Sequence, residues 1–300
     1  MNAPDAYRYL VVDVFTRQPL EGNALAVFPQ ASKIDDVLMQ RIARELNLAE
    51  TAFVLPATRP DCAVSVRIFT PTKEMLFAGH PTIGTAFVLL EEDIVPGQRE
   101  HFVLEEKVGP VPIRVEREGE RPLIWLRTPP IEDGRVYDRG VCAESLGIEP
   151  KDLMDISPQL LSAGNPTIFI PVKDKGTVDR TMMDMRGMRN LNGVDGEPAC
   201  VFVFTPTREG AYSRMFAPEY GIVEDPATGS STGPLASFMM RHGLVSAVPG
   251  TRFISEQGTK MGRRSILYVH VMGQNGADGI EVGGYVTPVA EATMRLRGDR

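Results

Sequence analysis

The same series of motifs occurs twice in this sequence, and this duplication constrains the fold more than any other feature. Three motifs recur in both halves: residues 22–24 (GNA) and 164–166 (GNP), 53–59 (FVLPATR) and 202–208 (FVFTPTR), and 67–71 (RIFTP) and 214–218 (RMFAP). The spacing between the copies is far too long for a solenoid of short stacked repeats. We therefore expect two similar domains, with Arg67 and Arg214 in equivalent positions and a small-ligand cleft between the domains.

Both halves carry residue patterns that predict secondary structure. β-branched and aromatic runs predict strands at residues 9–15, 24–28, 51–55, 63–69 and 167–172. Apolar residues at helical spacing predict one helix over 35–46, and a second helix is expected near 81–90. The predicted fold class is α+β, divided into residues 1–129 and 130–300, with the last strand allowed to cross back to the first half.

The composition narrows the class of protein. With 43% hydrophobic and 24% charged residues and a net charge of −7, the chain is an ordinary globular protein without the basic face of a nucleic-acid binder. It lacks a secretory signal pattern and an apolar run near the ~20 residues of a membrane helix, so we expect a cytoplasmic protein. Three scattered cysteines and four scattered histidines predict neither a disulfide framework nor a metal site.

Each half places a glycine-bearing loop before a helix that is rich in small residues. Gly79 and His80 occupy this position in the first half, and Gly229 and Ser230 occupy it in the second. The free backbone N–H groups and the dipole at a helix start can bind an anion. We expect these loops to bind a substrate carboxylate, although loops that only cap their helices remain an alternative.

Three acidic or basic side chains are candidates for catalysis or binding. Glu45 lies on the flank of the apolar stripe of the first helix, where partial desolvation would suit a general base; an ion pair with Arg41, one turn away, is the alternative. His80 could donate to a substrate oxygen or shuttle a proton, or could simply cap its helix. Asp225 is either a site residue or a turn residue.

One motif suggests a different class of enzyme. Residues 229–233 (GSSTG) match G-x-S-x-G, the nucleophile elbow of serine hydrolases, with Ser231 as the nucleophile. That elbow needs a buried strand running into the turn, and the preceding Glu224-Asp225-Pro226 does not suit a core strand. The hydrolase is therefore the least favoured hypothesis. Neither G-x-G-x-x-G nor G-x-x-x-x-G-K occurs, so nothing predicts a dinucleotide or P-loop site.

Several motifs resemble the PhzF-like family of phenazine-biosynthesis isomerases. In order, they are residues 13–15 (DVF), 20–23 (LEGN), 41–50 (RIARELNLAE), 68–71 (IFTP), 77–81 (FAGHP), 214–218 (RMFAP) and 221–230 (GIVEDPATGS). The likeness spans the chain from Val12 to about Gly243. It implies the diaminopimelate-epimerase-like fold, which has two pseudo-symmetric domains, each a curved β-sheet wrapped around a central helix.

The resemblance also implies a site and a reaction. Glu45 would be the acid/base, and His80, Asp225 and Ser230, with the loop glycines, would line the substrate site. The best-known member isomerises trans-2,3-dihydro-3-hydroxyanthranilate without a cofactor. Related epimerases use one cysteine in each duplicated loop, but residues 78–81 and 225–230 contain none. One carboxylate moving a proton along one face of the substrate therefore fits better than inversion by two bases.

The resemblance leaves the substrate and pathway open, because proteins that share a fold and a catalytic set act on different molecules. It implies a homodimer, in keeping with the commonest oligomeric state. A non-catalytic ligand-binding or interaction protein on the same fold is the alternative to an isomerase. The complete set of Glu45, His80, Asp225 and Ser230 argues against that alternative.

Overall fold

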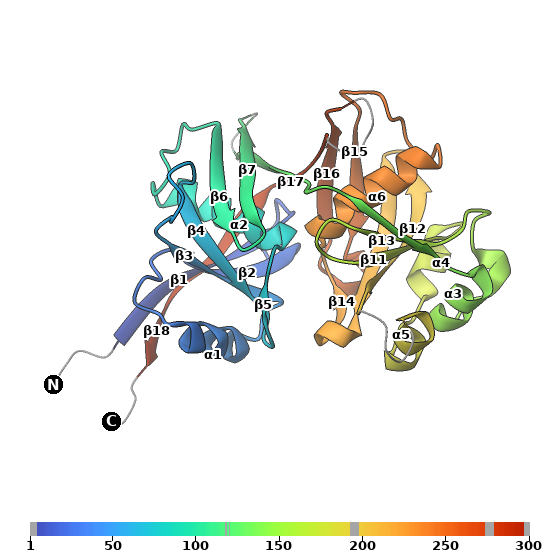
Figure 1. Cartoon of the computed structure of the whole chain (residues 1–300), viewed down its shortest axis with the longest axis horizontal. Coiled ribbons are helices and arrows are strands. Elements are labelled where there is room, and N and C mark those ends of the chain that lie inside the picture. The colour runs from blue at the N-terminus through green and yellow to red at the C-terminus, as the bar shows by residue number, and fades with distance from the viewer. Residues whose placement is uncertain (1–4, 118, 120, 193–197, 274–278, 297–300) are drawn as a thin grey trace. The chain divides into compact units, whose positions relative to one another are not determined.

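The computed structural model describes residues 5–117, 119, 121–192, 198–273 and 279–296. It divides the chain into two compact units, of which unit 1 comprises Met1–Leu126 with Tyr285–Arg300 and unit 2 comprises Arg127–Gly284. Each unit is a single sheet with a helix against it (Figure 1). The sequence placed the division at residues 129 and 130 and allowed the last strand to cross back. In the structure that strand belongs to unit 1.

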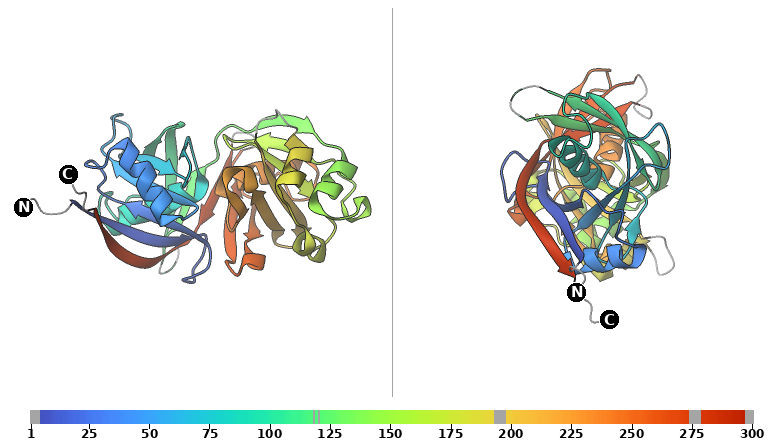
Figure 2. Two further views of the ribbon diagram at one scale, coloured as in Figure 1. Left: turned by 90° about the horizontal axis from the view of Figure 1, so that it is seen from below. Right: turned by 90° about the vertical axis from the view of Figure 1, so that its left-hand side faces the viewer.

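The sheet of unit 1 runs in the order β18, β1, β2, β3, β4, β6, β7, β8, with β5 beside β4. Two of its pairs are parallel, β2 with β3 and β4 with β6. Its strands are β1 Asp5–Val14, β2 Asn23–Phe28, β3 Glu50–Leu55, β4 Val64–Phe69, β5 Glu74–Met75, β6 His101–Glu106, β7 Gly109–Glu116, β8 Leu123–Arg127 and β18 Val286–Leu296. The first strand and the last lie side by side as an antiparallel pair (Figure 2).

The sheet of unit 2 repeats this arrangement in the order β9, β10, β11, β12, β13, β15, β16, β17, with β14 beside β13. The parallel pairs are again the third with the fourth strand and the fifth with the sixth. Its strands are β9 Glu132–Val136, β10 Gln159–Ser162, β11 Thr167–Pro171, β12 Cys200–Thr207, β13 Gly210–Ala217, β14 Ile222–Asp225, β15 Arg252–Gln257, β16 Ser265–Val271 and β17 Ile280–Gly284. The duplication predicted from the motifs is thereby confirmed.

One helix lies at the centre of each unit. In unit 1, α2 (Gly79–Glu91) is buried without interruption from its first residue to Leu89, and it contacts β1, β2, β3 and β18. In unit 2, α6 (Gly229–Arg241) is buried as far as Met239 and contacts β10, β11, β16 and β17. A helix buried on all sides needs small residues where it meets the sheet. A Cβ at Gly84 would lie 2.6 Å from Leu25 Cδ2, so this glycine permits the close approach of α2.

The remaining helices cover the outside of the sheets. In unit 1, α1 (Asp36–Leu46) packs on β3 and β4, and the Asp35 carboxylate caps it by accepting the Leu38 N–H at 2.9 Å. It ends at Asn47, whose φ of 51° is a left-handed conformation that asparagine tolerates. Besides α6, the α-helices of unit 2 are α3 Arg139–Leu146, α4 Lys175–Arg180 and α5 Met185–Asn192. The sequence-predicted helices and strands are thus confirmed, with ends that differ by a few residues.

Candidate functional site

His80 is the second residue of α2 and is only 4% exposed. Its Nδ1 lies 3.2 Å from Asn23 Nδ2, and its Nε2 lies 3.3 Å from Glu50 Oε2. The amide nitrogen of asparagine can only donate, so Nδ1 must be the acceptor. The single proton of the neutral imidazole is therefore on Nε2, the nitrogen that faces Glu50.

The charge state of His80 follows from its burial. Burial lowers the pKa of His80 from its ordinary value of 6.5 to about 3, because a buried site disfavours the charged imidazolium. With burial dominant, the imidazole is neutral at pH 7 and offers one N–H donor at Nε2.

The sheet brings the partners of His80 together. β2 begins at Asn23 and β3 begins at Glu50, and the two strands are parallel with Leu25 opposite Glu50. Both side chains therefore lie at the same end of the sheet, at the start of α2. The Glu50 side chain is only 12% exposed, which makes it the partly desolvated carboxylate of this site.

Glu45 does not share this environment. It lies in the last turn of α1 with its side chain exposed, and in the described part of the chain it forms no hydrogen bond or ion pair, with Arg41 or any other residue. The helix buries Met39, Ile42 and Ala43. At ~100° per residue, Glu45 points about 110° away from the centre of that buried set. The prediction that helix geometry partly desolvates Glu45 is therefore wrong.

Ser230 occupies on α6 the position that His80 occupies on α2. Asn165 Nδ2 donates to Ser230 Oγ at 3.4 Å, as Asn23 does to His80. Both asparagines belong to the duplicated G-N motif. Asn23 begins β2 in unit 1, and Asn165 lies two residues before β11 in unit 2. The same asparagine therefore orients an imidazole in unit 1 and a hydroxyl in unit 2.

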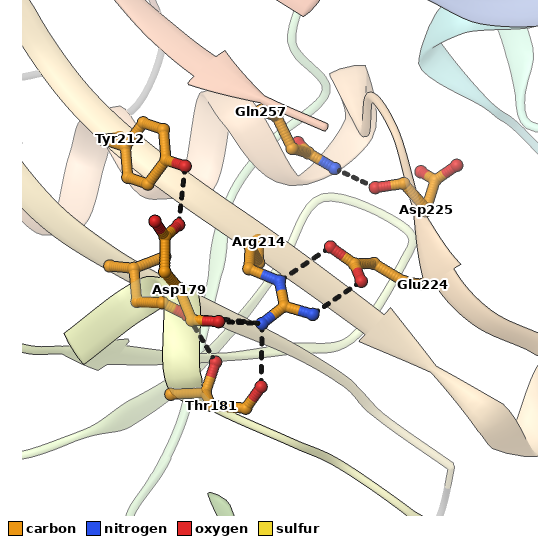
Figure 3. A network of polar contacts seen from close by, with 8 residues as sticks. Asp179, Thr181, Tyr212, Arg214, Glu224, Asp225 and Gln257 are labelled. Carbon is orange, nitrogen blue, oxygen red and sulfur yellow. Dashed lines mark hydrogen bonds and ion pairs between the residues drawn. The ribbon is translucent and has the colours of Figure 1, made fainter. Parts of the chain in front are cut away.

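Asp225 is the last residue of β14, lies a few residues before α6, and is buried. Its carbonyl accepts Gln257 Nε2 at 2.7 Å (Figure 3). Its carboxylate accepts the Thr228 hydroxyl at 2.5 Å. These bonds hold the turn into α6, so Asp225 is a turn residue in this structure. A direct role for its carboxylate in binding substrate remains a prediction.

The two helix starts carry no side-chain cap. Gly79 and Gly229 are the first residues of α2 and α6, and neither Ala78 nor Thr228 at the cap position makes a side-chain cap hydrogen bond. The capping alternative is therefore not supported for Thr228. First-turn N–H groups without a side-chain cap are suited to binding an anionic ligand.

Ser231 is not placed as a nucleophile. Its side chain is fully buried, and its Oγ lies 2.8 Å from Thr167 Oγ1. A hydrolase serine must face its substrate and a general base, and this hydroxyl faces a threonine of β11. The hydrolase alternative is therefore not supported.

No group of three or more histidine, cysteine, aspartate or glutamate side chains within the described residues could hold a metal ion. No disulfide joins the three described cysteines, of which Cys142 and Cys200 are buried. Of the described helices, none is both long and apolar enough to span a bilayer.

Sequence reasoning missed Glu50 and the two asparagines. Glu50 is the last residue of the 41–50 motif, but it lies beyond the predicted helix of residues 35–46, so helix periodicity could assess Glu45 and not Glu50. Asn23 and Asn165 stood in a duplicated motif that was used only as a sign of the repeat. Their signal was the recurrence of a polar side chain, since a turn alone would have needed only the glycine.

Comparisons with known proteins agree over nearly the whole chain. The sequence model of a family described as "Phenazine biosynthesis-like protein" matches residues 12–292. A trans-2,3-dihydro-3-hydroxyanthranilate isomerase of Pseudomonas aeruginosa is 33% identical over 291 residues, which cover 97% of this chain and 100% of that protein. An uncharacterized isomerase of Mesorhizobium japonicum is 35% identical, covering 95% of this chain and 98% of its own.

A solved structure shares the fold. The crystal structure of a Bacillus anthracis phenazine biosynthesis protein of the PhzF family superposes with a TM-score of 0.85 and 24% identity. The match covers 97% of this chain and 100% of that one. The predicted fold, two similar α+β halves each with a sheet around a central helix, is thereby confirmed.

Proposed function

The chain belongs to the phenazine biosynthesis-like protein family and is an isomerase like its curated relatives, and on this premise we propose that it moves a proton within a small carboxylated substrate, with Glu50 as general acid/base. The observation that supports Glu50 is its contact with buried His80, at 3.3 Å from Nε2. The Glu50 side chain is only 12% exposed, so its carboxylate is largely removed from bulk water, as suits a general base.

The proposed reaction needs one proton and one carboxylate. Glu50 takes a proton from a substrate carbon, and the electron pair of that C–H bond shifts the double bond along the substrate. The same carboxyl group then returns the proton to another carbon, so no net charge, oxidant or water is consumed. Neutral His80 does not compete for this proton, and its Nε2–H can donate to Glu50 or to a substrate oxygen.

The substrate carboxylate is proposed to bind at an uncapped helix start. Backbone N–H groups of the first turn of α2 supply donors, and the adjoining Gly79 leaves room for close approach of the anion. The duplication predicts a similar contribution from Gly229 and Ser230 at the start of α6. Trans-2,3-dihydro-3-hydroxyanthranilate, for which the Pseudomonas aeruginosa relative is named, or a related compound is the proposed substrate.

A pair of matched substitutions tests the acid/base. Turnover of trans-2,3-dihydro-3-hydroxyanthranilate is followed in D2O, where deuterium enters the product at carbon to the extent that the Glu50 carboxyl group exchanges its proton with solvent before returning it. Glu50→Gln keeps the size of the side chain and removes the base, so turnover should fall by about 10²–10⁴-fold. Glu45→Gln serves as the control and should leave turnover nearly unchanged.

The same pair decides between the two glutamates. The acid/base role that the family resemblance implies for Glu45 predicts the reverse result, with loss in Glu45→Gln and near-normal turnover in Glu50→Gln. Activity in both variants would remove the single-carboxylate mechanism. No turnover in the wild-type protein would mean that its substrate is another compound. The Glu50→Gln and Glu45→Gln variants would then be compared for turnover of that compound.

We also propose a cytoplasmic homodimer that works without a cofactor. Light scattering at micromolar concentration should then give twice the chain mass of 33.0 kDa. Dialysis against a chelator should leave turnover unchanged. A monomeric mass would contradict the homodimer. Activity lost on chelation and restored by a metal would contradict the absence of a metal cofactor.

A further inference from the structure

Glu106 is a buried acidic side chain that the proposed reaction does not use. It ends β6, is 5% exposed, and lies at the start of α2. Its Oε1 lies 2.6 Å from Thr82 Oγ1, while its Oε2 is buried with no hydrogen-bond partner. Within the described residues no cation pairs with it. An ionised carboxylate left in this state would be very costly, because nothing replaces the water it has lost.

The threonine beside Glu106 has one proton and two oxygen neighbours. Thr82 Oγ1 lies 2.8 Å from the Ala78 carbonyl oxygen and 2.6 Å from Glu106 Oε1. A carbonyl oxygen can only accept, and so can an ionised carboxylate. The one hydroxyl proton cannot serve both contacts. If Glu106 carries a proton, it donates to Thr82, and Thr82 donates to Ala78, so both contacts become hydrogen bonds.

The second repeat has an uncharged side chain at the equivalent place. Gln257 ends β15 as Glu106 ends β6, and both strands alternate exposed and buried residues in the same order. The Gln257 amide donates to the Asp225 carbonyl at 2.7 Å (Figure 3). It also donates to Thr228 Oγ1 at 3.0 Å. Its Oε1 accepts the Thr228 N–H at 3.1 Å. A protonated carboxyl group resembles this amide in offering both a donor and an acceptor, whereas an ionised carboxylate can only accept.

We propose that Glu106 is a protonated carboxylic acid at neutral pH, and that it positions His80 by closing the first turn of α2 through Thr82. The Thr82-to-Ala78 hydrogen bond spans the turn that contains Gly79 and His80. Ionisation of Glu106 would withdraw its donor and leave Thr82 between two acceptors. The turn would then open at the point where it presents His80 to Glu50.

The titratable groups on the neighbouring elements contact other residues and do not neutralise Glu106. They are His80 of α2 with Glu50, Arg67 of β4 with Glu74 and Asp36, Lys107 after β6 with Glu74, Arg114 of β7 with Glu116, and Glu105 of β6 with Thr58. Burial raises the pKa of Glu106 from its ordinary 4.5 to about 8, against the opposing effect of the Thr82 hydrogen bond. This direction agrees with the hydrogen-bond geometry.

A titration followed by NMR tests the protonation directly. In protein labelled with carboxyl-¹³C glutamate, one resonance should titrate with a midpoint near pH 8 and should be missing from Glu106→Gln. Glu105→Gln is the matched control, since hydrogen bonds from Thr58 lower the pKa of the neighbouring Glu105. It should remove a resonance that titrates below the ordinary 4.5. A Glu106 resonance that titrates at or below 4.5 would overturn the proposal.

Thermal unfolding gives a second readout with a defined sign. A raised folded-state pKa stabilises the protein below the unfolded pKa of 4.5, and this contribution is lost as pH rises through about 8. The Tm of the wild-type protein should thus fall relative to Glu106→Gln by about 4 °C or more between pH 4.5 and pH 8. Parallel pH profiles, or a Glu106→Gln protein that does not fold, would contradict a neutral Glu106.

The positioning role has its own test, and this one alone rests on the proposed function. Glu106→Gln should keep kcat within about threefold at pH 7 and remove the decline of wild-type kcat above pH 8, whereas Glu106→Ala should lose about tenfold in kcat. Rescue by glutamine but not by alanine identifies the hydrogen bonds, not the charge. A kcat equally low in both variants would overturn the positioning role of Glu106. If the protein acts on a different substrate, the NMR titration still reports the protonation state of Glu106.

Discussion

Asn23 Nδ2 lies 3.2 Å from His80 Nδ1, and this contact decides which nitrogen of the imidazole carries the proton. The amide can donate but not accept through its nitrogen, so the proton of neutral His80 is on Nε2, which lies 3.3 Å from Glu50 Oε2. Asn165 orients the Ser230 hydroxyl in the same way in unit 2. An asparagine that precedes each central helix by a long stretch of chain thus controls the polar group at the helix start.

Reversing the tautomer of His80 should reduce turnover. Asn23→Asp replaces the donor by an acceptor, so Nδ1 would take the proton and Nε2 would face Glu50 without one. We expect kcat to fall by about tenfold or more, as when another catalytic histidine is held in the wrong tautomer. The ¹⁵N shifts of His80 report the tautomer independently. Unchanged shifts with reduced turnover would show that Asn23 acts in another way.

The burial of neutral His80 predicts a loss of stability in acid. Its pKa is depressed to about 3, against 6.5 when unfolded, so the unfolded chain binds more protons between these values. The stabilising contribution is present above pH 6.5 and is lost as pH falls toward 3. In urea titrations, wild type should lose up to about 1.4 kcal/mol per pH unit relative to His80→Gln over this window. Equal slopes would mean that Glu50 keeps His80 charged.

The two equivalent arginines should differ in their contribution to stability. Arg67 Nε donates to Glu74 at 2.7 Å, and Arg214 Nε donates to Glu224 at 2.8 Å, so the ion pair is duplicated with the fold. Arg214 is the more buried of the two, at 13% exposure against 24%. It also donates to the carbonyl groups of Asp179 and Thr181 (Figure 3).

Removing the more buried arginine should cost more. Arg214→Ala leaves the Glu224 carboxylate, which is only 13% exposed, without its cation and should destabilise unit 2 by up to about 3–5 kcal/mol. Arg67→Ala should cost less, because its second partner, Asp36, is exposed and an exposed pair contributes about 0–1 kcal/mol. Urea denaturation of both variants measures the difference. Equal losses would show that solvent reaches both pairs alike.

Ser231→Ala should leave turnover within about twofold of wild type. The hydroxyl contacts only Thr167 in the described part of the chain, and an internal hydrogen bond of this kind contributes about 1 kcal/mol to stability. Thermal unfolding should show that small loss. A variant that folds normally but has lost turnover by a hundredfold would restore the serine as a catalytic candidate.

The sequence predicted the fold well because the strand-forming segments are local and occur twice. The R-x-F-x-P motif in each half was enough to predict that Arg67 and Arg214 are equivalent. They lie on β4 and β13, and each pairs with an acidic side chain, Glu74 or Glu224. Strand β18 could not be placed in this way. Its pairing with β1 joins residues more than 270 positions apart, such as Leu10 with Glu291, and no local pattern encodes such a contact.

The candidate site was predicted only in part, for a related reason. Helix periodicity reports which face of α1 is buried, and it could therefore assess Glu45. It says nothing about Glu50, whose burial depends on a strand start meeting the distant helix α2. The equivalence of Glu106 and Gln257 was also hidden, because an ionisable and a neutral side chain look alike only when the first is protonated.

The pairing of β1 with β18 also sets an order of events during synthesis. Residues 127–284, the whole of unit 2, emerge from the ribosome before β18 is made. Unit 2 can therefore bury its core while β1 still lacks the neighbour along one edge. An open strand edge can pair with another extended segment. In the nascent chain, β1 is therefore exposed to mispairing until β18 has been synthesised.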